Sequence, residues 1–211
     1  MLAKGSLSWI GVMMLFTLAV GYVSKSFTGL VFYILLIAFI IGAILTLFFF
    51  IFFRDPERSP LGDEDDAVSP ADGKVISIHN RTLCIFMNIH DVHVNRAPLA
   101  GTIAHIDYKP GGYIPAFNKD SDVNERNHVV INTDTGVLEL TQIAGVLTRR
   151  IVSYICVGSH VKRGERIGMI RFGSRVDVIV PEGYEFIVGV NDKVKAGQTI
   201  IAMRKGKIRR K

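Results

Sequence analysis

The most restrictive feature of the sequence is its apolar N-terminal quarter. No charged residue occurs within residues 26–53, and Lys25 alone interrupts the uncharged stretch that begins at residue 5. An α-helix rises about 1.5 Å per residue, so residues 30–53 would extend about 36 Å, which is enough to cross a hydrocarbon core of about 30 Å with some tilt. The sequence therefore excludes a simple soluble globule and predicts a transmembrane helix.

The earlier apolar run, residues 7–23, is close to the lower length limit for a membrane span. Because Lys4 precedes it, this run could instead be the core of a signal peptide, but no small-x-small cleavage site follows it. The next residues, 24–29, read SKSFTG, which is typical of a tight polar turn. We therefore predict a membrane anchor of two transmembrane helices over residues 1–53.

Basic residues predict how the chain is oriented. Lys4, Arg54 and Arg58 would lie on one side of the hairpin against a single lysine on the other, and an excess of positive charge marks the cytoplasmic side. We therefore expect a cell-membrane protein with its large domain in the cytoplasm. The formal net charge of +6 comes from a basic tail, residues 204–211, which could contact the anionic inner leaflet or be solvated. Because residues 54–203 are slightly acidic, no nucleic-acid partner is expected.

Beyond residue 66 the sequence changes to short apolar or alternating runs that are separated by Gly, Pro, Asn and Asp. This pattern is typical of an all-β sandwich or barrel. The runs are KVISI, LCIFMNI, TIAHIDY, HVVINT, VLELTQIAG, IVSYICV, RIGMIRFG, VDVIVP, EFIVGV and TIIAMR. Residues 114–127 are expected to form an irregular loop or a short helix. Cys84 and Cys156 lie inside apolar runs and are expected to be buried thiols in a reducing compartment.

Two segments of the β region repeat one another. Residues 160–170, HVKRGERIGMI, and residues 193–203, KVKAGQTIIAM, share the form Val-Lys-x-Gly-x-x-Ile. The Gly of such a turn can take a positive φ between two strands of a flattened barrel. The segments resemble the half-repeats of biotinyl and lipoyl carrier domains. One alternative function is therefore a membrane-tethered carrier or adaptor with Lys195 as the acceptor, although the usual Met-Lys-Met or Asp-Lys-Ala tip is missing.

Two short motifs contain groups that could act as a nucleophile and a base. Gly173-Ser174 interrupts a strand-like run, so it is either an ordinary turn or a bulge where the Ser hydroxyl could attack the preceding carbonyl. His90 and His93 lie three residues apart and are either surface histidines or parts of one pocket. No further spaced ligands accompany them, so no metal site is expected.

Two more motifs carry charge. Asp72, in SPADG, is either a turn-capping carboxylate or a group that orients a histidine. Arg126, in NERN, lies either in a solvated loop or beside a phosphate or carboxylate. Asp, His and Ser together would also suit a membrane-anchored serine peptidase, which is the second alternative function.

The order of the motifs resembles the short form of phosphatidylserine decarboxylase, a branch that includes archaetidylserine decarboxylases. RFGSRVD is the most specific motif, because the longer branch of the family typically has Leu-Gly-Ser-Thr there. The motifs are FFRDPERSP at residues 52–60, SPADGKV at 69–75, HDVHVNRAP at 90–98, NERN at 124–127 and RFGSRVD at 171–177. The resemblance implies an enzyme that converts the serine head group of a phospholipid to ethanolamine.

The resemblance also implies how the enzyme matures. Such proenzymes cut themselves between the residues that are Gly173 and Ser174 here, giving a β chain of residues 1–173 and an α chain of residues 174–211 that stay together as a heterodimer. Ser174 would become a covalent pyruvoyl group. That cofactor accepts the charge left behind by CO2 without pyridoxal phosphate. The catalytic β domain would be residues 54–203.

The resemblance assigns roles to four catalytic residues. Ser174 is the nucleophile, His93 the base that activates it, Asp72 the carboxylate that orients His93, and His90 a participant in decarboxylation. Three arginines are candidates for the substrate phosphodiester by charge and position alone, with the first preferred because it adjoins Ser174: Arg175, Arg126 and Arg96. The sequence does not distinguish an ester-lipid from an ether-lipid substrate. Exposed strand edges in so small a β domain would also permit a higher oligomer.

Overall fold

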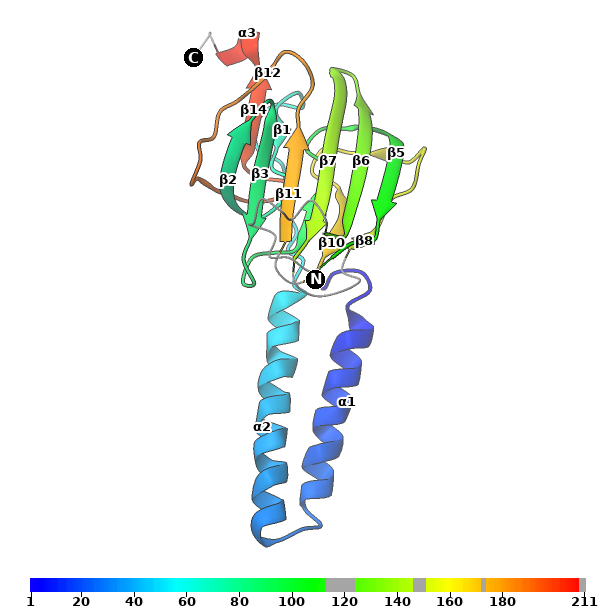
Figure 1. Ribbon diagram of the computed structural model, residues 1–211, viewed down its shortest axis with the longest axis vertical. Coiled ribbons are helices and arrows are strands. Elements are labelled where there is room, and N and C mark those ends of the chain that lie inside the picture. The colour runs from blue at the N-terminus through cyan, green and yellow to red at the C-terminus, as the bar shows by residue number, and fades with distance from the viewer. Residues whose placement is uncertain (113–123, 146–150, 172–173, 209–211) are drawn as a thin grey trace. The chain divides into compact units, whose positions relative to one another are not determined.

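The computed structural model describes residues 1–112, 124–145, 151–171 and 174–208 (Figure 1). The chain divides into two compact units, Met1–Pro56 and Glu57–Lys211. The first unit is helical, and the regular elements of the second are β-strands apart from one short helix. Each unit is described by itself below.

The first unit is a helical hairpin, as the sequence predicts. Helix α1 spans Leu7–Ser24 and helix α2 spans Gly29–Phe52, and both are long and apolar enough to cross a membrane. Small residues lie where the helices meet, because a Cβ on Gly42 would be 2.6 Å from Thr17 Oγ1. Glycine at such a position lets two helix backbones approach closely, as in membrane helix pairs.

The second unit is built on one eight-stranded antiparallel sheet with the order β13-β2-β3-β11-β7-β6-β5-β9. Figure 1 shows β2, β3, β11, β7, β6 and β5 side by side in this order. The strands lie at Gly73–His79 (β2), Thr82–Met87 (β3), Gly101–Lys109 (β5), Arg126–Thr133 (β6), Gly136–Ala144 (β7), His160–Val161 (β9), Ser174–Ile179 (β11) and Lys193–Val194 (β13). Strand β11 is central and pairs with β3 on one side and β7 on the other.

Two three-stranded sheets complete the unit, in the orders β1-β14-β12 and β4-β10-β8. Their strands are Ala67–Val68 (β1), Val94–Arg96 (β4), Ile151–Ser153 (β8), Arg166–Ile170 (β10), Tyr184–Phe186 (β12) and Ile200–Arg204 (β14), and a short helix, α3, follows at Lys205–Ile208. The predicted mainly β class is therefore confirmed. Of residues 114–127, the structure describes 124–127, and β6 begins within them.

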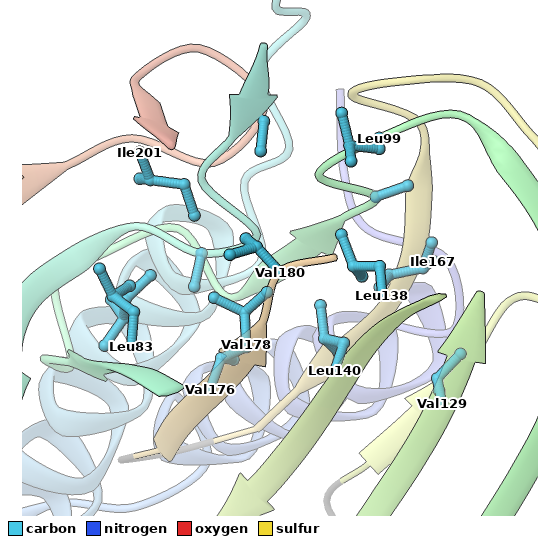
Figure 2. Packing of buried hydrophobic residues seen from close by; sticks show 14 of the residues in the cluster. Leu83, Leu99, Val129, Leu138, Leu140, Ile167, Val176, Val178, Val180 and Ile201 are labelled. Carbon is cyan, nitrogen blue, oxygen red and sulfur yellow. The ribbon is translucent and has the colours of Figure 1, made fainter. Parts of the chain in front are cut away.

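The core lies on the inner face of the large sheet, where alternate residues of β3, β11, β7 and β6 are buried. Val176 and Val178 of β11 pack beside Leu138 and Leu140 of β7, and Ile167 of β10 contributes from the opposite sheet (Figure 2). Burying one such side chain contributes about 1.5–3 kcal/mol. The same alternation places Ser174, two residues before Val176, on this inner face.

The predicted repeat is visible in the fold. Gly164 and Gly197 have positive φ values of 77° and 70°, and their N–H groups donate to Ala97 O and Ser69 O at 2.8 and 2.7 Å. The two-residue strands that precede these turns, β9 and β13, lie at opposite edges of the large sheet. Each half of the repeat therefore closes one edge of the sheet.

One residue of the basic tail binds acidic side chains of its own domain. Lys207 Nζ lies 2.7, 3.0 and 2.6 Å from carboxylate oxygens of Asp63, Asp65 and Asp66. Partial burial opposes the charged form of Lys207, but the hydrogen bonds to the three carboxylates outweigh burial and raise its pKa above the usual value. This contact fixes the end of the chain to the segment before β1.

The expectation of two buried thiols is wrong, because neither thiol is fully buried. Cys84 on β3 is half-buried, whereas Cys156 is exposed. The run IVSYICV predicts a longer strand than the structure has, because β8 ends at Ser153. Cys156 lies beyond that end, and its Sγ is 3.1 Å from Ser159 Oγ.

Candidate active site

Ser174 is the first residue of the central strand and is completely buried. Its cross-strand partners are Met87 on β3 and Ala144 on β7. The Ser174 hydroxyl donates a hydrogen bond to Met87 Sδ at 3.3 Å. Gly173 lies outside the described residues. The predicted nucleophile is thus held at one end of the sheet, between uncharged strand neighbours.

His93 is fully buried just before β4. Its main-chain oxygen accepts a hydrogen bond of 3.1 Å from the N–H of Ile170, the last residue of β10. From Ile170 the chain reaches Ser174 within a span of about 14 Å. Pairing between β4 and β10 therefore brings the predicted base to the end of the sheet where Ser174 lies.

The imidazole of His93 is oriented by a main-chain carbonyl. Its Nδ1 lies 2.9 Å from Asp91 O. A carbonyl can only accept a hydrogen bond, so Nδ1 carries the proton, and Nε2 of the neutral ring carries the lone pair. Nε2 is itself buried. The ring is therefore held in the tautomer that a general base requires.

Asp72 has different partners. Arg58 binds both carboxylate oxygens, with Nη2 donating to Oδ2 at 2.8 Å, and the Ala196 N–H donates to Oδ1 at 2.7 Å. Within the described part of the chain, His93 is not among the hydrogen-bond partners of this carboxylate. The role of Asp72 toward His93 stays a prediction, and its contacts join segments that are distant in the sequence.

His90 lies in the turn between β3 and β4, three residues past Met87. The Asn88 N–H donates to Asp91 Oδ2 at 2.7 Å and closes the turn. The His90 side chain is 76% exposed, and its Nε2 is 3.8 Å from Asp91 Oδ1. The structure thus places His90 beside the strand end that carries Met87, with its ring accessible to solvent.

The three candidate arginines fall into two groups. Arg175 and Arg126 both pair with Ile143 of β7, one from each side, so they lie in a single cross-strand row. Arg175 forms a two-pronged ion pair with Asp177, at 2.8 and 2.7 Å, while Arg126 is half-buried. Arg96 lies elsewhere and donates to a main-chain carbonyl of the first repeat turn at 3.0 Å.

Comparison with known proteins identifies the family. A sequence model described as phosphatidylserine decarboxylase matches residues 45–202. The chain belongs to the phosphatidylserine decarboxylase family. It is therefore a decarboxylase, a member of the lyase class, and the resemblance inferred from the sequence motifs is confirmed.

Two relatives show how far the similarity extends. A protein of Methanococcoides burtonii with the provisional name archaetidylserine decarboxylase proenzyme is 48% identical over 207 residues, which is 97% of each chain. The phosphatidylserine decarboxylase proenzyme of Streptomyces coelicolor is 52% identical over 155 residues, which is 71% of this chain and 70% of the relative. Similarity of this extent favours the decarboxylase over the carrier and peptidase alternatives.

The burial of several polar residues near Ser174 was not predicted from the sequence. NERN is not a solvated loop, because Asn124, Glu125 and Asn127 are exposed by only 1, 4 and 2%. Asn124 Nδ2 donates to the carbonyl of Ala144 at 2.8 Å, beside Ser174, and Glu125 accepts a hydrogen bond from the Tyr108 hydroxyl. NERN leads directly into a β-strand pattern, and polar side chains that are buried in a sheet need hydrogen-bond partners. The sequence therefore already indicated that these side chains could be buried and hydrogen-bonded.

Gln142 was also missed. Leu138, Leu140 and Ala144 alternate along β7 and point into the core, and Gln142 occupies the inward position between Leu140 and Ala144. The alternation of VLELTQIAG therefore contained the information that this amide is buried. Asn127 Nδ2 donates to Gln142 Oε1 at 3.0 Å, so two missed residues satisfy one another.

Proposed function

We propose that this chain is a proenzyme that cuts itself between Gly173 and Ser174 and then decarboxylates the serine head group of a membrane phospholipid, using a pyruvoyl group formed from Ser174. The observation that carries the proposal is the fully buried hydroxyl at the first residue of the central strand, within the RFGSRVD motif. The relatives' names, which include the word proenzyme, support a chain that is processed.

The cut begins with proton transfer. His93 Nε2 takes the Ser174 hydroxyl proton, Oγ attacks the Gly173 carbonyl carbon, and the peptide bond breaks as its nitrogen is protonated, which leaves an ester. Elimination then removes the Cα proton of residue 174 to a base as the Cβ–Oγ bond breaks, which leaves a carboxylate on Gly173 and a dehydroalanine at position 174. A proton then moves to Cβ to give an imine, water adds to the imine carbon, and ammonia leaves, so that a ketone remains. The tautomer that Asp91 O imposes on His93 supports the first step.

The surroundings of Ser174 fit an uncharged ketone. Its strand neighbours Met87 and Ala144 are apolar and fully buried, so they would hold the group and exclude water. A pyruvoyl group at position 174 would supply an electron sink for the electron pair that CO2 leaves behind on the substrate. A carboxylate loses CO2 more readily where water is excluded, because desolvation removes the stabilisation of its charge.

His90 is proposed to deliver the proton that replaces CO2 on the substrate α-carbon. Its ring is exposed to solvent, and the turn that carries it follows directly from Met87. His93, by contrast, is buried and serves the cut. The two histidines of one motif would thus act in different stages.

The substrate is proposed to be a phospholipid with a serine head group. Arg126 and Arg175 share one row at the Ser174 end of the sheet and could bind its phosphodiester, whereas Arg96 lies outside this row. The near-full-length relatives are named for archaetidylserine and the shorter matches for phosphatidylserine. Both lipids present the same head group, so an assay of each with one enzyme preparation identifies the preferred lipid core.

The proposed organisation has an anchor over residues 1–53, a catalytic domain over 54–203 and a basic tail. The positive residues beside the hairpin support a cytoplasmic catalytic domain. Strand β11 pairs in register with β3 and β7 over its whole length, which supports a β and an α chain that remain a heterodimer after the cut.

Intact-mass measurement of the purified protein tests the proposal. We expect two polypeptides, with the smaller beginning at position 174 and carrying a ketone in place of its amine. Ser174→Ala should remain one chain of about the full 23.4 kDa. A single intact chain, or an unaltered Ser174 in fully active protein, would overturn the proposal.

A further inference from the structure

A continuous series of buried polar side chains leads to Ser174. Asn127 Nδ2 donates to Gln142 Oε1 at 3.0 Å, and Gln142 Nε2 donates to Asn95 Oδ1 at 2.8 Å. Asn95 Nδ2 in turn donates to Met87 Sδ at 3.7 Å, and this sulfur also accepts the Ser174 hydroxyl at 3.3 Å. Each of these side chains is at most 2% exposed. The three amides therefore form a relay that ends at the proposed nucleophile.

The relay connects two sheets. Asn127 and Gln142 are cross-strand partners on the large sheet, whereas Asn95 belongs to β4 in a small sheet. Gly168 on β10 is the register partner of Asn95, and a Cβ there would lie 3.1 Å from Gln142 Nε2 and 2.8 Å from Val152 O. Glycine at position 168 therefore leaves the space in which the Gln142 amide crosses between the sheets.

An apolar core would not require these amides. The inward positions of β7 before Gln142 are Leu138 and Leu140, and another leucine would continue the same packing. Burying an amide is unfavourable unless it is hydrogen-bonded, whereas a fully bonded network fixes one arrangement of its members. The relay therefore contributes a defined geometry beyond what hydrophobic packing provides.

We propose that Asn95 and Gln142 are positioning residues for self-cleavage, acting through Met87 to hold the Ser174 hydroxyl in one rotamer. This inference rests on the proposed function. A serine side chain has three staggered rotamers, and the hydrogen bond to sulfur favours one of them. Methionine is itself flexible, so its sulfur needs a partner such as the Asn95 amide to stay in place.

The relay also accounts for the direction in which Oγ points. Asn95 contacts the same sulfur as Ser174, so the hydroxyl is held toward β4. His93 lies two residues before Asn95, immediately before β4 begins. Releasing the hydroxyl from this rotamer would turn it away from the strand that leads to the base.

The test follows cleavage of the full chain during cell-free synthesis in the presence of phospholipid vesicles. We expect Asn95→Leu and Gln142→Leu to cut about 10- to 100-fold more slowly than the wild type, because small displacements of a reacting group reduce rates by such factors. The double variant should cut no more slowly than the slower single variant, since both act on one relay. Met87→Leu conserves volume but removes the acceptor, so it should show the same slowing.

Ile131→Ala is the matched control for a general loss of stability. Ile131 is fully buried on the inner face of β6 and takes no part in the relay. The stability of every variant is measured by limited proteolysis in the Ser174→Ala background, where no chain can cut itself. We expect Ile131→Ala to cut at close to the wild-type rate even if it is the least stable variant.

Hydroxylamine identifies the affected step, because it cleaves the ester and leaves a hydroxamate on Gly173 and a free amine on Ser174. In the relay variants, hydroxylamine should release the C-terminal fragment more slowly than in the wild type, by the same factor as cutting without hydroxylamine. Three results would each overturn the inference. The first is release of the fragment by hydroxylamine at the wild-type rate in the relay variants, and the second is cutting of Met87→Leu at the wild-type rate without hydroxylamine. The third is an Ile131→Ala variant that cuts as slowly as the relay variants. An uncut wild type or a cut Ser174→Ala would instead refute the proposed function.

Discussion

Asp72 and Arg58 form a buried ion pair in which the guanidinium contacts both carboxylate oxygens. The N–H of Ala196 donates to the same carboxylate, and the Ala196 carbonyl accepts from Arg58 Nη1 at 2.9 Å. Arg58 and Asp72 precede the proposed cut, whereas Ala196 follows it. The ion pair therefore joins the two chains that the cut would produce.

Arg58→Gln and Asp72→Asn should destabilise the protein to a similar extent. The two side chains are only 9 and 11% exposed, so removing either one leaves a buried charge uncompensated and lowers the free energy of unfolding by about 3–5 kcal/mol. Denaturant unfolding of both variants in the Ser174→Ala background measures the loss. If Asp72 instead orients His93, then Asp72→Asn stops the cut while Arg58→Gln, equally destabilised, still matures.

His93→Ala and His90→Ala should fail at different stages. Loss of a general base slows proton transfer by about 100- to 10,000-fold, so His93→Ala should accumulate as an uncut chain. His90→Ala should be cut normally but should release labelled CO2 slowly. A denaturing gel and a CO2-release assay separate the two effects, and normal maturation of His93→Ala would contradict the assigned base.

Arg126→Gln and Arg175→Gln should weaken substrate binding. A hydrogen bond to a charged group contributes about 1.5–3 kcal/mol, so each change should raise KM for the lipid by roughly 10- to 100-fold. Arg81→Gln is the control, since its partially exposed side chain lies at the β2–β3 turn and donates to Val180 O. Kinetics in mixed micelles provide KM. Unchanged KM values for both arginine variants would contradict the proposal that Arg126 and Arg175 bind the substrate.

Gly73→Ala should destabilise the fold through the backbone. Gly73 has φ +146°, and a Cβ there would collide with the carbonyl oxygen of Phe86 on β3. Strain of this kind costs about 1–3 kcal/mol. Gly189→Ala is the matched control, because the nearest atom to a Cβ there is Asp192 Oδ2 at 3.7 Å. Equal unfolding midpoints for the two variants would contradict the expected clash.

Lys207 should make stability depend on alkaline pH. Its pKa is raised in the folded protein, so its ion pairs stabilise the fold fully below the ordinary lysine pKa of about 10.4, and this contribution is lost as the pH rises through the higher folded value. Lys207→Met should therefore lower the melting temperature at neutral pH, with a difference from wild type that narrows at strongly alkaline pH. Lys205→Met, at an exposed position of α3, should have little effect.

Most of the fold follows from periodicity in the sequence. Each of the ten predicted β runs contains a strand, because alternation over five or more residues indicates a half-buried strand. Strands β1, β4, β9 and β13 were not predicted, since two or three residues are too few to show a period. Their pairing depends on contacts between distant segments, such as Val68 with Ile200.

The site could be predicted less completely. Motifs indicated Ser174 and His93, but the Ala196 partner of Asp72 could not be inferred. That contact depends on the second repeat turn packing against the segment that follows β1, which is distant in the sequence. The relay could not be inferred either. It requires a hydrogen bond between Asn95 and Gln142, which belong to different sheets, in the space beside Gly168. No local sequence pattern predicts a contact between two sheets.

The position of β11 has a consequence for the lifetime of the enzyme. A severed peptide that still forms the middle of a sheet, bonded to neighbours along both edges, cannot be exchanged without unfolding the domain. Each molecule would therefore acquire its reactive end once. Chemical damage to that end, by reduction for example, would be permanent, and the cell could restore activity only by synthesising new protein.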